Sequence, residues 1–350
     1  MRHIHGGDIY RNKVELDYSV NINPLGVPEG VKEAVCSSLE QAVNYPDTEC
    51  TKLREAIAEL EQIDKDYIVC GNGAAELIYM ACMAVKPQKA LLIAPTFAEY
   101  EQALKVVDCE IEYYVLKEEN EFHVRKDYLN FLQEDLDMVF ICNPNNPTGH
   151  LISKEFLNEI LFCCKKYNII VVLDECFIDF VEGGEGCSMK ENIKEYPNLL
   201  LIKAFTKFFA MAGIRLGYGF TSSLSLREKM KETVQPWSVS VLAQAAGCRA
   251  CLEGEYIKLT KESITKEREF LIAQLESLSK LEDGWIEKVF DSKANFVFIK
   301  AKEEIYIKLK EKGILIRDCS NYYGLKKGYY RIAVKSHEDN VRLLSEIKSI

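Results

Sequence analysis

The sequence is poor in histidine and has no long apolar run. Only five of its 350 residues are histidine, and His3, His123, His150 and His337 share no spacing with other metal-ligand residues. We therefore expect these four at the surface, and we predict neither a metal site nor a histidine general base. No apolar run approaches the ~18 residues of a membrane span, and the N-terminal MRHIHGGDIY lacks the apolar region of a secretion signal. We expect a protein that does not bind membranes.

Positive charge is also scarce. The 44 lysines and arginines are outnumbered by 54 aspartates and glutamates, which gives a net charge of −10. A nucleic-acid backbone repels an acidic protein, so we predict no nucleic-acid partner. A local basic pocket for a small anion remains compatible with this charge balance.

Cysteine is abundant, but its distribution argues against disulfides. The 13 cysteines are odd in number, and several stand within apolar runs, as Cys70, Cys142 and Cys176 do. This pattern is typical of reduced thiols, so we expect a cytoplasmic protein. Cys248 and Cys251 form a CxxC pair in a helical composition, with no second pair at metal spacing, and we assign them to helix packing.

Short apolar runs alternate with helical patterns from about residue 66. Strands that are apolar throughout and alternate with helices predict an α/β fold with a mainly parallel sheet covered on both faces. The runs that we expect to form these strands lie at 67–70, 90–95, 111–116, 138–144, 169–175 and 199–205.

A different pattern follows residue 240. A long helical stretch at 241–278 precedes strand-like and helix-like segments that end at 334, which predicts a smaller α+β domain. We expect three parts: an N-terminal arm and helix at 1–40 that packs with the small domain, a large domain at 41–238, and the small domain at 239–350.

The segment 201–218 places a lysine between apolar runs. Burial of an ammonium is costly, lowers the lysine pKa and frees the amine as a nucleophile. Thr206 and Arg215 flank Lys207 with a hydroxyl and a fixed cation, which suits a phosphate group. An amine beside a phosphate site is what pyridoxal 5'-phosphate (PLP) requires. On this stretch alone, a surface lysine at the end of a strand is an equal alternative.

Other polar clusters also follow the apolar runs, where ligands of such sheets bind. Asp174 ends the run IIVVL and needs a cationic partner, which the pyridinium nitrogen of PLP provides, or it caps the next segment. Asn146 in the turn NPTG can donate to the phenolic oxygen of PLP. The glycine turn at 71–76 precedes a helix whose first N–H groups can receive a phosphate. Phe97 either stacks on the ring or packs in the core.

The ordered set GNG, PTF, NPTG, DE, TK and GIRLGY resembles the fold-type I PLP enzymes of the aminotransferase superfamily over nearly the whole chain. The resemblance implies a seven-stranded sheet, homodimers with active sites at the subunit interface, Lys207 as the Schiff-base lysine and Asp174 as partner of the pyridinium nitrogen. The other cofactor ligands that it implies are Gly73, Ala74, Phe97, Asn146, Thr206, Arg215 and, from the partner subunit, Tyr45.

Two families within the superfamily compete. These are the L-threonine-O-3-phosphate decarboxylases of cobalamin synthesis and the histidinol-phosphate aminotransferases. HGGDIY leading into DYSVNINPLG, Phe97, Phe177, PWSVS and RDCSNYYGLKKGYYRIAV resemble the decarboxylases more, whereas Ala74 and Ala75 depart from their pattern. We expect decarboxylation of threonine phosphate to (R)-1-amino-2-propanol O-2-phosphate, with transamination of histidinol phosphate as the alternative.

The substrate in either case is a small phosphorylated amino compound. Arg331 matches the arginine that usually binds the α-carboxylate, and with Arg317 it can bind a phosphate. Asn146 would also contact the substrate. His5, Gly6 and Asn21 are candidates for closing the site, although a frayed terminus also accounts for the HGG segment.

A non-catalytic PLP-binding regulator is the alternative from another class of function, and the acidic net charge disfavours it.

Overall fold

The computed structural model describes residues 5–350, and a mixed sheet of seven strands forms its centre. β8 is antiparallel to both of its neighbours, and the pairs among the other strands are parallel. The α/β fold with a mainly parallel sheet is therefore confirmed. In spatial order the strands are β2 (Ile68–Gly71), β8 (Gly217–Phe220), β7 (Leu199–Ala204), β6 (Ile170–Asp174), β5 (Met138–Cys142), β3 (Lys89–Ala94) and β4 (Glu110–Val115).

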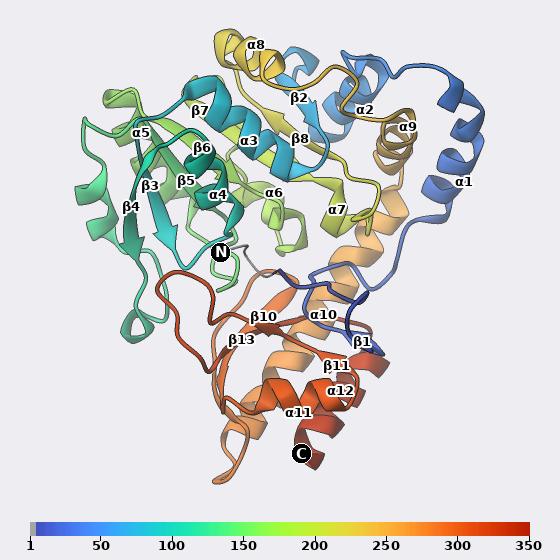
Figure 1. Cartoon of the computed structure of the whole chain (residues 1–350), viewed down its shortest axis with the longest axis vertical. Coiled ribbons are helices and arrows are strands. Elements are labelled where there is room, and N and C mark those ends of the chain that lie inside the picture. The colour runs from blue at the N-terminus through green and yellow to red at the C-terminus, as the bar shows by residue number, and fades with distance from the viewer. Residues whose placement is uncertain (1–4) are drawn as a thin grey trace.

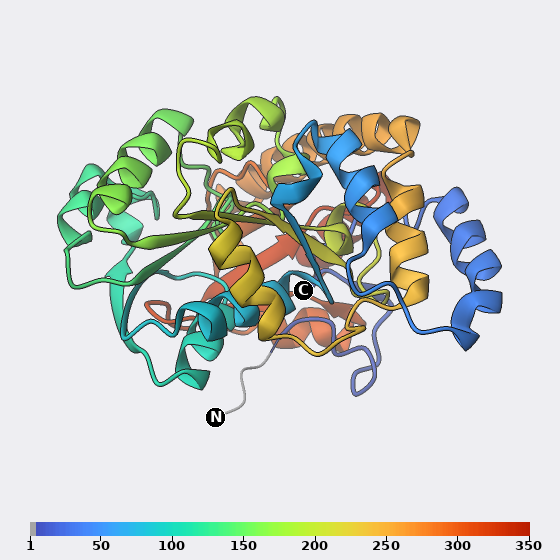
Figure 2. The ribbon, with the colours of Figure 1, turned by 90° about the horizontal axis from the view of Figure 1, so that it is seen from above.

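Helices cover both faces of this sheet (Figure 2). Met138 and Phe140 pack on one face of β5, and Val139 and Ile141 pack on the other. Burial on both faces explains why the strands are apolar throughout. One face carries α3 (Ala74–Val85), α4 (Glu99–Val106) and α8 (Leu224–Glu232); the other carries α2 (Thr51–Glu61), α5 (Lys154–Lys166), α9 (Val241–Ala250) and part of α10 (Gly254–Ser279).

A second sheet lies below the first in Figure 1. It is antiparallel, with the order β12-β13-β10-β9, and the long helix α10 runs from the first sheet towards it. No helix within residues 5–350 is both long and apolar enough to cross a membrane. The elements of this part are β9 (Ile286–Val289), β10 (Phe296–Ala301), α11 (Ile305–Glu311), β11 (Ile314–Leu315), β12 (Arg317–Asp318), β13 (Tyr329–Ala333) and α12 (His337–Ser349).

The N-terminal arm joins the two parts of the molecule. Its strand β1 (Leu16–Asp17) pairs in parallel with β11, and the Tyr18 carbonyl accepts from Ala333 N–H at 3.1 Å. Further along, α1 (Glu29–Ser38) packs against α9. The arm therefore contacts the small antiparallel sheet, while its helix contacts a helix of the upper part. The division of the chain at residues 40 and 238 stays a prediction.

Three local predictions differ from the structure. β8 has the sequence GYGF, and because glycine has a low strand propensity, this segment does not stand out as a strand in the sequence. The helix expected at 241–278 is interrupted, because Glu253 leaves the helical conformation (φ −85°, ψ 55°) just before Gly254. His150 is buried, with its ring centroid 3.8 Å from that of His123, so its surface placement is wrong. Burial and His123 lower the pKa of His150 to about 4.

The remaining histidine and cysteine predictions have simpler outcomes. His123 and His337 are exposed, which confirms their surface placement, and His337 lies 3.2 Å from Glu267; His3 falls outside the described residues. Cys248 and Cys251 are free thiols that pack against the core, which confirms their assignment to helix packing.

Candidate active site

A cavity of about 200 Å³ lies where β5, β6 and β7 end and the N-terminal arm meets the small sheet. Two of the predicted site residues, Gly73 and Tyr45, do not line it. The predicted residues that do are His5, Gly6, Asn21, Ala74, Phe97, Asn146, Asp174, Thr206, Lys207, Arg215, Arg317 and Arg331. The structure thus brings twelve of the fourteen together, and their roles remain predictions.

Lys207 lies in the single helical turn α7 (Phe205–Phe208), which follows β7 directly. Asn23 fixes this turn: its N–H donates to the Lys207 carbonyl at 3.1 Å, and its Nδ2 donates to the Phe208 carbonyl at 2.7 Å. Burial, followed by the nearby charges of Arg331 and Arg215, lowers the pKa of Lys207 to about 8. The amine is therefore a far better nucleophile near neutral pH than an ordinary lysine.

Asp174 is the last residue of β6 and is 5% exposed. Its Oδ1 accepts from the Cys176 N–H at 2.9 Å, and its Oδ2 accepts from the Tyr100 hydroxyl at 2.6 Å. No ion pair of Asp174 with a lysine or arginine occurs within residues 5–350. A buried carboxylate that is hydrogen-bonded but lacks a cation suits a cationic ligand atom.

The N-terminus of α3 forms another part of the wall. Gly73 caps the helix with φ +83°, and a Cβ there would lie 2.6 Å from a terminal nitrogen of Arg215. A Cβ at Gly217 would lie 2.5 Å from Ala74 N. Gly73 therefore allows Arg215 to approach the start of the helix closely, and Gly217 allows β8 to do the same. The free N–H groups of the first turn and the guanidinium form an anion site of the kind that a phosphate occupies.

The small sheet contributes two buried arginines. Arg331, on β13, donates to Asn146 Oδ1 and, at 2.7 Å, to the Ser19 carbonyl. Arg317, on β12, donates to the Asp318 carbonyl at 2.7 Å and to Asn321 Oδ1 at 2.9 Å. Arg331 therefore links the small sheet to the turn after β5 and to the arm, whereas these bonds of Arg317 stay within its own segment.

The N-terminal arm closes one side of the cavity. His5 Nε2 lies 2.9 Å from Glu99 Oε1, and a Cβ at Gly6 would lie 2.3 Å from the Ser19 carbonyl oxygen. Asn21 is buried beside them. Among the described residues, Asn21 Oδ1 and Arg331 Nε are buried atoms with no hydrogen-bond partner. An acceptor and a donor left open in one cavity indicate a polar ligand.

The cavity has two chemically different sides. We call Ala74, Asn146, Asp174, Thr206, Lys207 and Arg215 the cofactor wall, and His5, Gly6, Asn21, Arg317 and Arg331 the substrate wall. The cofactor wall combines a nucleophilic amine, a buried carboxylate and an anion site. These are the groups that would hold the aldehyde, the ring nitrogen and the phosphate of PLP, so the residues present fit this cofactor.

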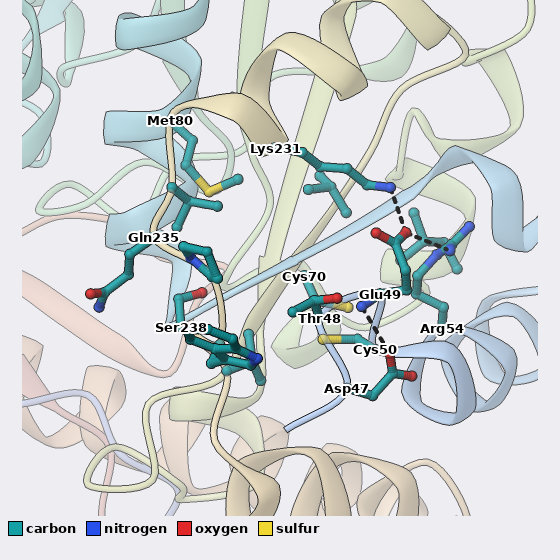
Figure 3. A pocket seen from close by; sticks show the side chains of 16 residues that line it. Asp47, Thr48, Glu49, Cys50, Arg54, Cys70, Met80, Lys231, Gln235 and Ser238 are labelled. Carbon is teal, nitrogen blue, oxygen red and sulfur yellow. Dashed lines mark hydrogen bonds and ion pairs between the residues drawn. The ribbon is translucent and has the colours of Figure 1, made fainter. Parts of the chain in front are cut away.

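Tyr45 lies away from this cavity. It is 79% exposed and stacks on Trp237, with 4.5 Å between the ring centroids. Beside this stack is another cavity, shown in Figure 3, where Lys231 and Arg54 converge on Glu49 at 2.6 Å and 4.0 Å. Its cations are already neutralised, so it offers no comparable anion site.

Sequence reasoning missed several residues that line or support the cavity. Tyr322 and Cys176 line the cavity, Ser19 supplies a carbonyl to Arg331, and Tyr100 and Asn23 support the cavity from behind. Asn23 and Ser19 lie in the stretch DYSVNINPLG. Its two asparagines, in a segment with neither helical nor strand periodicity, were the available sign that these residues have a special role. Tyr100 gave no signal, because an aromatic residue in a helix is ordinarily a core residue.

Comparison with known proteins agrees with this geometry. The family model "Aminotransferase class I and II" matches residues 13–347. A putative threonine-phosphate decarboxylase from Caldanaerobacter subterraneus subsp. tengcongensis is 40% identical over 351 residues, which cover 99% of this chain and 93% of the relative. The threonine-phosphate decarboxylase of Salmonella typhimurium is 36% identical over 338 residues, which cover 96% and 91%.

A solved structure extends the comparison to the competing activity. The histidinol-phosphate aminotransferase from Clostridium acetobutylicum has a TM-score of 0.89 and 34% identity, covering 95% of this chain and 98% of its own. The sequence and the fold thus point to one superfamily, and its members include both a decarboxylase and a transaminase. The chain belongs to the class I and II aminotransferase family and is a PLP-dependent enzyme.

Proposed function

We propose that this enzyme decarboxylates L-threonine O-3-phosphate to (R)-1-amino-2-propanol O-2-phosphate and CO₂, a reaction of cobalamin synthesis. The substrate wall fits this substrate, because two arginines that can bind its phosphate and the N-terminal arm face Lys207 across one cavity. The observation that carries the choice of decarboxylation is the similarity of the chain to two threonine-phosphate decarboxylases, at 40% and 36% identity.

On the cofactor wall, each part of PLP would have its own partners. Lys207 Nζ would bind the aldehyde carbon of PLP, Asp174 its ring nitrogen, and Asn146 its phenolic oxygen. Because Asn146 Oδ1 already accepts from Arg331, the amide nitrogen is the group left to donate. Thr206, Arg215 and the N-terminus of α3 would hold the phosphate. When bound, PLP withdraws electrons from the substrate Cα, and the bond perpendicular to its ring is the one that breaks.

The substrate wall decides which bond that is. Arg331 already donates to Asn146 and Ser19, and its Nε is a buried donor without a partner among the described residues. A phosphate has more acceptor atoms than this one donor can satisfy, so Arg317 and the N-terminal arm would bind the same phosphate. With both arginines binding phosphate, neither would be left to hold the α-carboxylate, which would favour its loss over loss of the Cα hydrogen.

Lys207 is also the group that completes the reaction. With the substrate amine in its place on the cofactor, Nζ would be free to move a proton. With a pKa of about 8, Nζ carries a proton in a large fraction of molecules near neutral pH and can deliver it to Cα after CO₂ leaves. No histidine is needed for this step.

Transamination of histidinol phosphate is the second candidate. The similarity to the Clostridium acetobutylicum histidinol-phosphate aminotransferase favours it, and its substrate also carries a phosphate but no carboxylate. The same arginines would then bind the phosphate, so the substrate wall serves both reactions.

We also propose a cytoplasmic homodimer with active sites at the subunit interface. Around Tyr45 the surface exposes large apolar side chains, namely Leu39, Val43 and Trp237. Such a patch is typical of an interaction surface. Mixing Tyr45→Ala with Lys207→Ala subunits would test this arrangement. Hybrid dimers should regain activity, since one of their two sites has both residues intact. Absence of any recovery in dimers that exchange subunits would contradict the shared site.

The decisive test for the reaction uses two assays on one preparation. PLP-loaded enzyme is incubated with threonine phosphate, and CO₂ and the phosphoamine are measured. In parallel, histidinol phosphate and 2-oxoglutarate are supplied, and glutamate is measured. We expect CO₂ and phosphoamine in equal amounts. Glutamate formation without CO₂ release would reverse the ranking of the two candidates.

A further inference from the structure

Both carboxylate oxygens of Asp174 accept a hydrogen bond from the protein. The Tyr100 hydroxyl donates to Oδ2 at 2.6 Å, and the Cys176 N–H donates to Oδ1 at 2.9 Å. A carboxylate has about four acceptor positions, so a further donor can still bind to Asp174 from the cavity. Of the two protein bonds, only the one from Tyr100 comes from a side chain distant in sequence.

Aromatic contacts hold Tyr100 in place. Its side chain is fully buried in α4. The ring stacks on Phe140 with 4.9 Å between the centroids and 16° between the planes, and it meets Phe97 edge-on at 5.6 Å. Phe97 lines the cavity and Tyr100 does not. Tyr100 therefore contacts both the aromatic residue predicted to stack on PLP and the carboxylate predicted to bind its nitrogen.

The direction of the bond between Tyr100 and Asp174 follows from burial. Burial, together with the charge of Asp174, raises the pKa of Tyr100 well above its usual value, so the hydroxyl keeps its proton and is the donor. A hydrogen bond donated to a carboxylate favours the ionised form, because the donor interacts with the negative charge. It also weakens the pull of that carboxylate on a proton that it shares with another partner.

We infer that Tyr100 is a positioning residue that orients Asp174 and keeps the proton shared with PLP on the ring nitrogen rather than on the carboxylate. A protonated ring nitrogen makes PLP a strong electron acceptor, so Tyr100 acts on the reaction without touching the cofactor or the substrate. The inference rests on the proposed placement of the ring nitrogen at Asp174, and it is independent of which substrate is used.

A purely structural role makes a different prediction. A buried tyrosine hydroxyl needs an acceptor, and Asp174 would then serve only to satisfy it. Removing the hydroxyl would change the stability of the fold in either case. Only the positioning role changes the protonation of the bound cofactor, so the test must observe the ring nitrogen itself.

The experiment is ¹⁵N NMR of the holoenzyme loaded with PLP that is labelled at the ring nitrogen. Tyr100→Phe keeps the aromatic packing and removes only the hydroxyl. We expect the ¹⁵N signal to move towards that of neutral pyridine and kcat to fall about tenfold, the value of one hydrogen bond to a charged group, while KM stays close to wild type. The matched control is Tyr114→Phe on β4, where the hydroxyl donates to Asp127 Oδ1, also at 2.6 Å, outside the cavity. It should leave the signal and kcat unchanged.

Asp174→Asn separates the two ways in which the inference can fail. If this variant does not move the ¹⁵N signal, the proposed placement of the ring nitrogen is wrong. If Asp174→Asn moves the signal and Tyr100→Phe does not, the placement stands and the role of Tyr100 is refuted. Should Tyr100→Phe not fold, 3-fluorotyrosine at position 100 supplies a stronger donor. It should move the signal away from neutral pyridine, and an unchanged signal would refute the inference.

Discussion

The cofactor wall and the substrate wall are formed by different kinds of structural element. Asp174, Asn146, Thr206 and Lys207 follow the ends of β5, β6 and β7, and Ala74 begins α3. On the substrate wall, His5, Gly6 and Asn21 belong to an arm, while Arg317 and Arg331 lie on short strands of the second sheet. The first wall is thus a fixed edge of the main sheet, and the second is assembled from two distant parts of the sequence.

This difference predicts how variants on the two walls should behave. Changes to the cofactor wall should affect cofactor binding or the chemical step. Changes to the substrate wall should chiefly affect substrate binding.

The largest effect is expected for Lys207→Ala. The variant should lose turnover by about 10⁴-fold, the upper end of what a positioned acid–base group contributes. It should also lose the visible absorption band of the enzyme-bound cofactor, which a spectrum records directly. Lys231→Ala, in the separate cavity of Figure 3, is the control and should keep both. A visible band that persists in Lys207→Ala would place the cofactor lysine elsewhere.

The two arginines should differ from each other. Arg317→Ala should raise KM for a phosphorylated substrate about 10–100-fold, the value of a lost hydrogen bond between charged groups, and leave kcat and PLP affinity largely unchanged. Arg331→Ala should raise KM similarly and also lower kcat, because Asn146 loses its partner. Steady-state kinetics and a PLP titration measure these values. A matching loss of PLP affinity in both variants would mean that the arginines bind the cofactor phosphate instead.

The pH dependence of cofactor capture should report the amine of Lys207. Its pKa of about 8 lies below that of an ordinary lysine, and only the neutral amine reacts with the aldehyde. The rate at which apoenzyme captures PLP should therefore rise about tenfold between pH 6 and pH 7 and level off above about pH 8. Arg331→Ala removes a nearby cation, so its inflection should lie at higher pH. Stopped-flow absorbance follows both, and a profile that still rises steeply above pH 9 would contradict the lowered pKa.

Gly73→Ala should have the smallest effect, and this effect should fall on cofactor binding rather than on substrate binding. The φ of +83° and the 2.6 Å approach to Arg215 both oppose a side chain at this position. We expect PLP to bind about fivefold more weakly, equivalent to about 1 kcal/mol, with little change in KM for the substrate. Gly213→Ala is the matched control, because a Cβ there meets no atom within 4 Å. Equal PLP affinities in the two variants would show that the approach of Arg215 is unimportant.

The contrast between the walls also explains what sequence could predict. Asp174 and Lys207 were recognisable because a charged residue at the end of an apolar run is conspicuous. Tyr100 was not, because its hydroxyl finds Asp174 only through the pairing of strands distant in sequence. His150 was misplaced for the same reason: its neighbour His123 comes from a turn before β5. β8 was not predicted because its glycines allow close approach of other chain segments and do not favour a strand: Gly217 lies against Ala74, and Gly219 lies against the Leu201 carbonyl of β7.

The pairing of β1 with β11 has a mechanical consequence. Three backbone hydrogen bonds, from Glu15 and Leu16 to Gly313 and from Tyr18 to Leu315, tie the arm to β11 and the turn before it, and the bond from Ala333 N–H to the Tyr18 carbonyl ties it to the small sheet. Arg331 adds a side-chain bond from the small sheet to the Ser19 carbonyl, at the end of this tied segment. The arm and the strands that carry both arginines are therefore already ordered relative to each other, so binding a substrate between them costs less conformational entropy than ordering a free arm would.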